Sequence, residues 1–113
     1  MTNYDELIAA YEVDVRFPDV SGMEHLDMLI TRSEIAKGER CLTDEQRDRL
    51  AEADQVLLRQ SPRFYQAIQE IADLDTWRRD EGAPSAYWWW YLDVLAQLPE
   101  PPTREQLPMA VPA

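Results

Sequence analysis

Helix-capping residues recur along this sequence, each followed by apolar residues at helical spacing, and this pattern constrains the fold more than any other feature. A serine, threonine or asparagine at such a position accepts a hydrogen bond from a free backbone N–H of the first helical turn. The capping positions are Asn3, Ser21, Thr43, Ser61 and Ser85. Two of them have the spacing of a reciprocal capping box, with Glu24 and Gln46 as the third helical residues. The sequence therefore predicts an all-α fold, a compact bundle of four to five short helices.

The apolar spacing assigns a range to each helix. We expect helices over 3–12, from Ser21 to Gly38, from Thr43 onward, from Ser61 past Trp77, and from Ser85 to about Gln97. Residues 13–17 are ambiguous, because Val13, Val15 and Phe17 alternate with charged residues in the two-residue period of a strand. We expect an extended connection there, and a strand paired with another chain is the alternative.

The C-terminal end has a different composition. From Pro99 onward the chain carries five prolines in fifteen residues, too many for a helix or a central strand. We therefore predict a single helical domain over 1–98 and a proline-rich tail over 99–113.

The net charge of the chain disfavours some classes of binding partner. Twenty-two acidic and eleven basic residues give a net charge of −11, which disfavours direct binding to nucleic acid or to an anionic membrane surface. Such an excess either attracts a basic partner or keeps a small protein dissolved. The first nineteen residues hold five acids against one arginine. The acids most suited to a partner surface are Asp5, Glu6, Glu12 and Asp14.

No recognisable catalytic or metal-binding motif occurs. His25 is the only histidine, so paired-histidine metal sites are excluded, and three dispersed glycines form no phosphate loop. Cys41 is a lone cysteine, which is typical of a reducing compartment. We expect a cytoplasmic protein that is not an enzyme and takes no metal or cofactor.

Five consecutive aromatic residues, Tyr87 to Tyr91, form the most unusual stretch. Successive residues of a helix point in directions about 100° apart, so one buried face cannot hold all five rings. Three explanations remain: a central helix packed on all sides, rings covered by the proline-rich tail, or an exposed anchor for a partner. The candidate partner-binding aromatics are Trp77, Tyr87, Trp88, Trp89, Trp90 and Tyr91.

Taken together, these features predict a regulatory or accessory protein that acts by binding another protein, in the manner of an antitoxin or adaptor. The partner would present a basic surface or one that accepts aromatic side chains, and a second copy of the chain is an alternative. Two other functions stay open. The chain would mimic nucleic acid and inhibit a basic nucleic-acid-binding protein, or it would bind a small ligand at the aromatic cluster.

Overall fold

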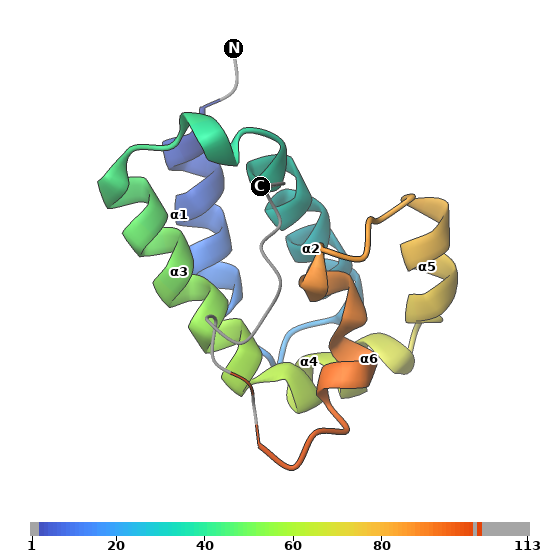
Figure 1. The fold of residues 1–113 in the computed structure, drawn as a ribbon. Helices are drawn as coiled ribbons and strands as arrows, with labels where there is room; N and C mark the ends of the chain where they lie inside the picture. The colour runs from blue at the N-terminus through green and yellow to red at the C-terminus, as the bar shows by residue number, and fades with distance from the viewer. Residues whose placement is uncertain (1–2, 101, 103–113) are drawn as a thin grey trace.

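The computed structural model describes residues 3–100 and 102, so most of the predicted tail lies outside the described residues. The described chain is all-α and compact, as the sequence predicts, with six α-helices and no strand (Figure 1). The helices are α1 (Tyr4–Asp14), α2 (Gly22–Lys37), α3 (Asp44–Arg59), α4 (Ser61–Gln69), α5 (Leu74–Asp80) and α6 (Leu92–Leu95). Two 3-10 turns, η1 (Glu39–Cys41) and η2 (Trp88–Tyr91), complete the order. No described helix has the length and apolar character needed to cross a membrane.

The first three helices begin and end largely where the caps indicate. Asn3 Oδ1 accepts from Glu6 N, and Ser21 Oγ accepts from Met23 N, both over 3.2 Å. Thr43 forms the full capping box with Gln46, with both hydrogen bonds present. Gly38 ends α2 as expected. These are local interactions, so the sequence is sufficient to predict them.

Helix α1 is longer than predicted, and residues 13–17 form no strand. The backbone N–H groups of Val15 and Arg16 donate to the carbonyls of Tyr11 and Val13, which closes the end of the helix. Val15 is fully buried and packs in the core. These backbone N–H groups are hydrogen-bonded within helical turns and are not available to a strand. The apparent alternation arises because Val15 faces the core while Val13 and Phe17 face solvent.

The predicted fourth helix is two helices. Its start is displaced as well, because Ser61 is already inside α4 and its Oγ donates to Leu58 O over 2.9 Å. The helix ends at Gln69, and Asp73 then begins α5 by accepting from Asp75 N over 3.2 Å and from Thr76 Oγ1 over 2.8 Å. This additional cap explains why the structure has one helix more than the upper prediction.

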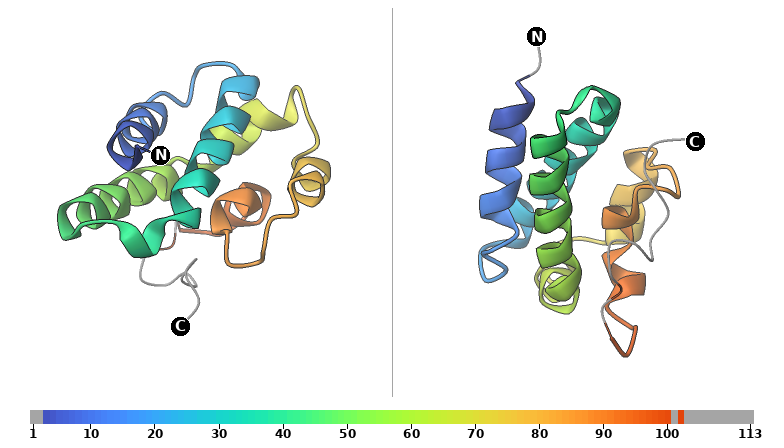
Figure 2. Two further views of the ribbon diagram at one scale, coloured as in Figure 1. Left: turned by 90° about the horizontal axis from the view of Figure 1, so that it is seen from above. Right: turned by 60° about the vertical axis from the view of Figure 1, so that its left-hand side comes forward.

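The fifth predicted helix, from Ser85 to Gln97, is also wrong in detail. Tyr87 leaves the helical region at φ −84° and ψ 73°, so a 3-10 turn and the short α6 replace a continuous helix. Figure 2 shows α1, α2 and α3 together on one side of the molecule, with α5, η2 and α6 on the other. Besides α5 and α6 on its own side, η2 also contacts α2, and its three tryptophans are buried.

Candidate interaction surface

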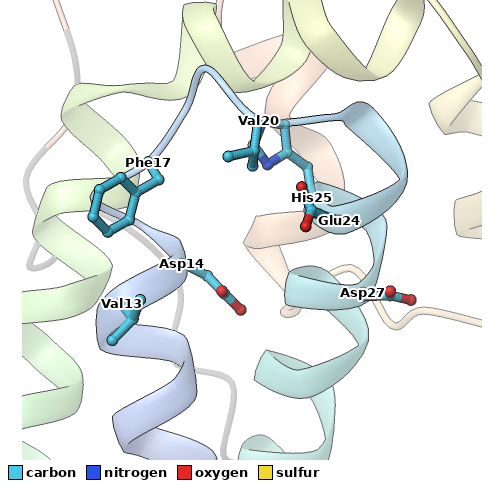
Figure 3. A pocket seen from close by; sticks show the side chains of 7 residues that line it. All are labelled: Val13, Asp14, Phe17, Val20, Glu24, His25 and Asp27. Atoms are coloured by element: carbon cyan, nitrogen blue, oxygen red, sulfur yellow. The ribbon is translucent and has the colours of Figure 1, made fainter.

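A groove opens at the corner where α1 turns into α2, and we call it the corner groove (Figure 3). Its volume is about 350 Å³. It combines apolar side chains with carboxylates and one histidine. The lining residues are Val13, Asp14, Phe17, Val20, Glu24, His25 and Asp27.

The apolar part of the groove consists of side chains that the core does not use. The core face of α1 carries Ile8 and Tyr11, both fully buried. Val13 lies off that face and Phe17 follows the end of α1, and the two are 57% and 56% exposed. Val20, in the connection to α2, is 43% exposed. Apolar side chains gathered at one hollow are more informative than single exposed ones, because such patches mark binding surfaces.

The acidic part of the groove comes from both helices. Asp14 projects from the end of α1 toward α2, and Glu24 lies in the first turn of α2 (Figure 3). Partial burial and the nearby charges of Glu24 and Asp27 raise the pKa of Asp14 above its ordinary value of 3.8, although His25 opposes this rise. In the described part of the chain, no arginine or lysine forms an ion pair with any of these three carboxylates. The groove is therefore negative and uncompensated.

His25 lines the groove from the first turn of α2, and it is buried although this turn also carries exposed residues. Its ring is buried, and Nε2 donates to the carbonyl of Pro18 over 2.9 Å. The ring also meets Phe64 edge-on, with the centroids 4.5 Å apart. These contacts fix the connection between α1 and α2, and so hold Phe17 and Val20 at the mouth of the groove.

The four acids predicted as a partner surface do not form one patch. Arg49 of α3 binds Glu12, with Nη2 2.6 Å from Oε1, and its Nη1 lies 3.7 Å from Asp5 Oδ1. Both acids therefore serve contacts between α1 and α3. Glu6 is exposed beside the N-terminal cap. Only Asp14 lines the corner groove.

The aromatic run is mostly core. Trp88, Trp89 and Trp90 are 3%, 0% and 1% exposed, so packing on all sides explains them and they offer almost no surface to a partner. Ser33 of α2 accepts from both Trp89 Nε1 and Trp90 Nε1, over 2.9 and 2.8 Å. The 3-10 geometry, with three residues per turn, was not expected and distinguishes the run from an α-helix.

The remaining candidate aromatics are half-buried. Tyr87 stacks on Trp89 with centroids 4.6 Å apart, and Trp77 packs against the edge of the core. The guanidinium of Arg78 lies 4.3 Å from the ring centre of Tyr91 and donates to Trp90 O and Asp93 Oδ1, each over 3.0 Å. These side chains hold α5 against η2 and α6 and have a structural role.

A smaller groove beside the aromatic run gives the small-ligand alternative a location. Its volume is about 210 Å³, and Tyr87 and Trp90 meet Pro84 and the end of α2 there. This is less than the roughly 300 Å³ at which ligand pockets usually begin. Lys37 is the one cationic residue among those that line this groove, and it is already paired with Glu34 there.

Sequence reasoning missed most of the corner groove, although a signal was present. Val13 and Phe17 are four residues apart and both fall outside the stripe formed by Ile8, Tyr11 and Val15. Val13 lies on the solvent side of α1 and Phe17 follows its end, so two apolar residues outside the core stripe predict a second contact surface. Glu24 and Asp27 gave no such signal, because an exposed acid is ordinary on a helix.

The described residues contain no group of three histidine, cysteine or acidic side chains arranged to hold a metal ion. Cys41 lies in η1, and its side chain is exposed. No protein-family model matches the chain, and neither the curated proteins nor the solved structures provide a match.

Proposed function

We propose that this chain is a non-catalytic, cytoplasmic protein-interaction module that binds another protein through the corner groove. The observation that carries the proposal is the gathering of Val13, Phe17 and Val20 at one hollow, more than two-fifths exposed in each case. Covering apolar surface of this kind is the main favourable term in protein association.

The surroundings of the groove support this function. His25, which lines the groove, is buried and hydrogen-bonded to Pro18 O, and this contact anchors the connection that carries Phe17 and Val20. A preformed surface loses less conformational entropy on binding than a mobile one. Phe17 is the largest exposed side chain at the mouth, and aromatic anchors are common among the residues that dominate binding energy.

The sequence adds further support for a binding role. The lone histidine and the absence of nucleophile or phosphate-loop motifs favour a binding role, and the lone cysteine favours a reducing compartment. The net charge of −11 favours a protein partner over nucleic acid or a membrane.

Photo-crosslinking tests the location of the contact. A photoreactive phenylalanine analogue is placed at Phe17 in one sample and at Val94 in another, and each is irradiated in lysate of the native host. Val94 is a matched control because it is 53% exposed and lies on α6, outside the corner groove. We expect a discrete cross-linked product from position 17 alone. Equal labelling at both positions, or none at either, would contradict the proposal.

Affinity capture adds a functional comparison. The wild-type protein, Phe17→Ser and Val94→Ser are used to capture partners from the same lysate. We expect Phe17→Ser to lose a stoichiometric partner that Val94→Ser retains. Sedimentation of the purified protein separates a different chain from a second copy, since self-association through the groove gives a dimer that Phe17→Ser abolishes.

A further inference from the structure

Three carboxylates of the corner groove have no ion pair among the described residues. Other exposed acids, such as Glu6, Asp48 and Glu52, also have none, but those of the groove lie beside exposed apolar side chains. Elsewhere, carboxylates that join one element to another meet an arginine: Glu12 meets Arg49, Asp19 meets Arg63 over 2.5 Å, and Asp93 meets Arg78. In the corner groove, Asp14, Glu24 and Asp27 have no such counter-charge among the described residues. An incoming cation would meet carboxylates that are not already neutralised.

The acids and the apolar side chains occupy different parts of the same hollow. Val13 lies on α1 and Phe17 just beyond its end, whereas Asp14 projects toward α2, whose first turn carries Glu24 (Figure 3). Val20 lies above, in the connection between the helices. A complementary occupant therefore carries an apolar side chain on one side and a positive charge next to it.

The environment of Asp14 favours a cation of the occupant beside it. Burial and the charges of Glu24 and Asp27 make the ionised form of Asp14 costly, as its raised pKa shows. A cation placed among these carboxylates removes the mutual repulsion and adds charge-assisted hydrogen bonds, which are stronger than neutral ones. The partial burial of Asp14 also reduces the screening that weakens ion pairs on an open surface, whereas Glu24 and Asp27 are exposed.

We infer that the corner groove receives a basic amphipathic helix of the partner protein, seating a lysine or arginine beside Asp14 and Glu24 and an apolar side chain against Phe17. A helix presents such a pair on one face when the two residues are three or four positions apart. The inference depends on the proposed function, because it names the chemistry of the partner for the same groove.

A designed peptide tests the inference without knowledge of the natural partner. The probe is an amphipathic helix of leucine and lysine, about 18 residues or five turns long. One control peptide has the same composition in a scrambled order, which keeps the charge and removes the apolar face. A second replaces every lysine with glutamine, which keeps the apolar face and removes the charge. Affinities are measured by fluorescence anisotropy, and amide chemical shifts locate the contact.

Protein variants isolate the groove from the overall charge. Asp14→Asn with Glu24→Gln removes two charges from the groove, and Asp48→Asn with Glu52→Gln removes two exposed charges from α3. We expect the groove variant to bind the leucine–lysine helix about tenfold more weakly than wild type, as for close charge pairs at other interfaces. The α3 variant should change affinity by less than about twofold, a change typical of exposed charges. Circular dichroism of each variant confirms that the fold is retained.

The outcomes separate failure of the inference from failure of the proposed function. The inference is overturned if the scrambled peptide binds as tightly as the amphipathic one, or if the two double variants weaken binding equally, because net charge alone then explains the attraction. If Phe17→Ser loses the natural partner while Asp14→Asn with Glu24→Gln retains it, the groove binds an apolar partner and the proposed function survives alone. If neither variant affects the natural partner, both fail.

Discussion

Arg32 and Asp54 form a two-point ion pair in the centre of the molecule, with neither side chain exposed to solvent. Arg32 Nε and Nη2 donate to Asp54 Oδ1 and Oδ2 over 2.9 and 3.0 Å. Tyr11 Oη donates to Asp54 Oδ1 over 2.6 Å, so the pair joins α1, α2 and α3. The guanidinium also lies 4.1 Å from the ring centre of Trp89.

The Arg32–Asp54 pair predicts strong destabilisation when one partner is removed. Arg32→Met should leave Asp54 buried without its counter-charge and lower the free energy of unfolding by about 3–5 kcal/mol. Burial alone would lower the pKa of Arg32, but Asp54 and then Tyr11 and Glu39 raise it, so the arginine stays charged. Urea unfolding followed by tryptophan fluorescence gives the measurement.

The double variant Arg32→Met with Asp54→Leu is the control for this prediction. It removes both charges at once, so we expect it to unfold at a higher urea concentration than Arg32→Met alone. A double variant less stable than the single one would contradict this prediction, and would show that Asp54 stabilises the fold through other contacts, such as its hydrogen bond from Tyr11 Oη.

Ser33 supports a second prediction, because one hydroxyl serves three partners. It accepts from the indole N–H groups of Trp89 and Trp90 and donates to Leu29 O over 3.0 Å, which uses its full hydrogen-bonding capacity. Ser33→Ala should leave two buried indole donors unsatisfied and cost about 1–3 kcal/mol of stability. Unfolding curves give the cost. Ser85→Ala, at an exposed serine, is the matched control and should change stability little.

Gly22 marks a close approach between α2 and α4. A Cβ atom at this position would lie 2.5 Å from Ala67 O and 2.7 Å from Ile71 Cγ1. Since Ala67 O is a backbone atom, α2 and α4 must move apart to admit even an alanine. We expect Gly22→Ala to lower the thermal midpoint, at a cost of roughly 1–3 kcal/mol, as overpacking does elsewhere. Met23→Ala, at the adjacent exposed position, should have a much smaller effect.

Asp14 predicts a pH dependence of stability. Because its folded pKa is raised above 3.8, ionised Asp14 destabilises the fold near pH 7. The folded state takes up the proton first on acidification, so this penalty diminishes as the pH falls through the folded pKa and is gone below 3.8. Asp14→Asn should therefore be more stable than wild type near pH 7, with a difference that diminishes toward pH 4. Urea unfolding at both pH values tests this, with Glu52→Gln as charge-matched control; a difference that grows on acidification would contradict it.

Local signals account for the parts of the fold that could be predicted. The caps at Asn3, Ser21 and Thr43 act within one helical turn, so the first three helices follow from neighbouring residues. Asp73 is also a capping residue, but Phe64, Ile68 and Ile71 continue at helical spacing up to it, which favoured a single helix past Trp77. Ile71 is half exposed, which shows that a periodic apolar pattern can continue past the end of a helix.

The candidate site was less predictable than the fold. Of the acids expected to meet a partner, Asp5 and Glu12 are held by Arg49, a residue more than thirty positions away. In the sequence, Glu45 and Glu52 lie at helical spacing from Arg49, so spacing alone gives no sign of its contact with α1. Charge pairing between helices depends on which faces meet, and a single sequence carries no record of that.

The sequence by itself determined the helical class, the start of the first three helices and the negative charge, because these depend on composition and on contacts within one turn. Only the tertiary structure decided that Trp88, Trp89 and Trp90 are core, that Arg32 and Asp54 are buried together, and that Asp14 and Phe17 share a groove. The physical reason is the range of the interactions. Caps join neighbours along the chain, whereas burial and ion pairing depend on segments that only packing brings together.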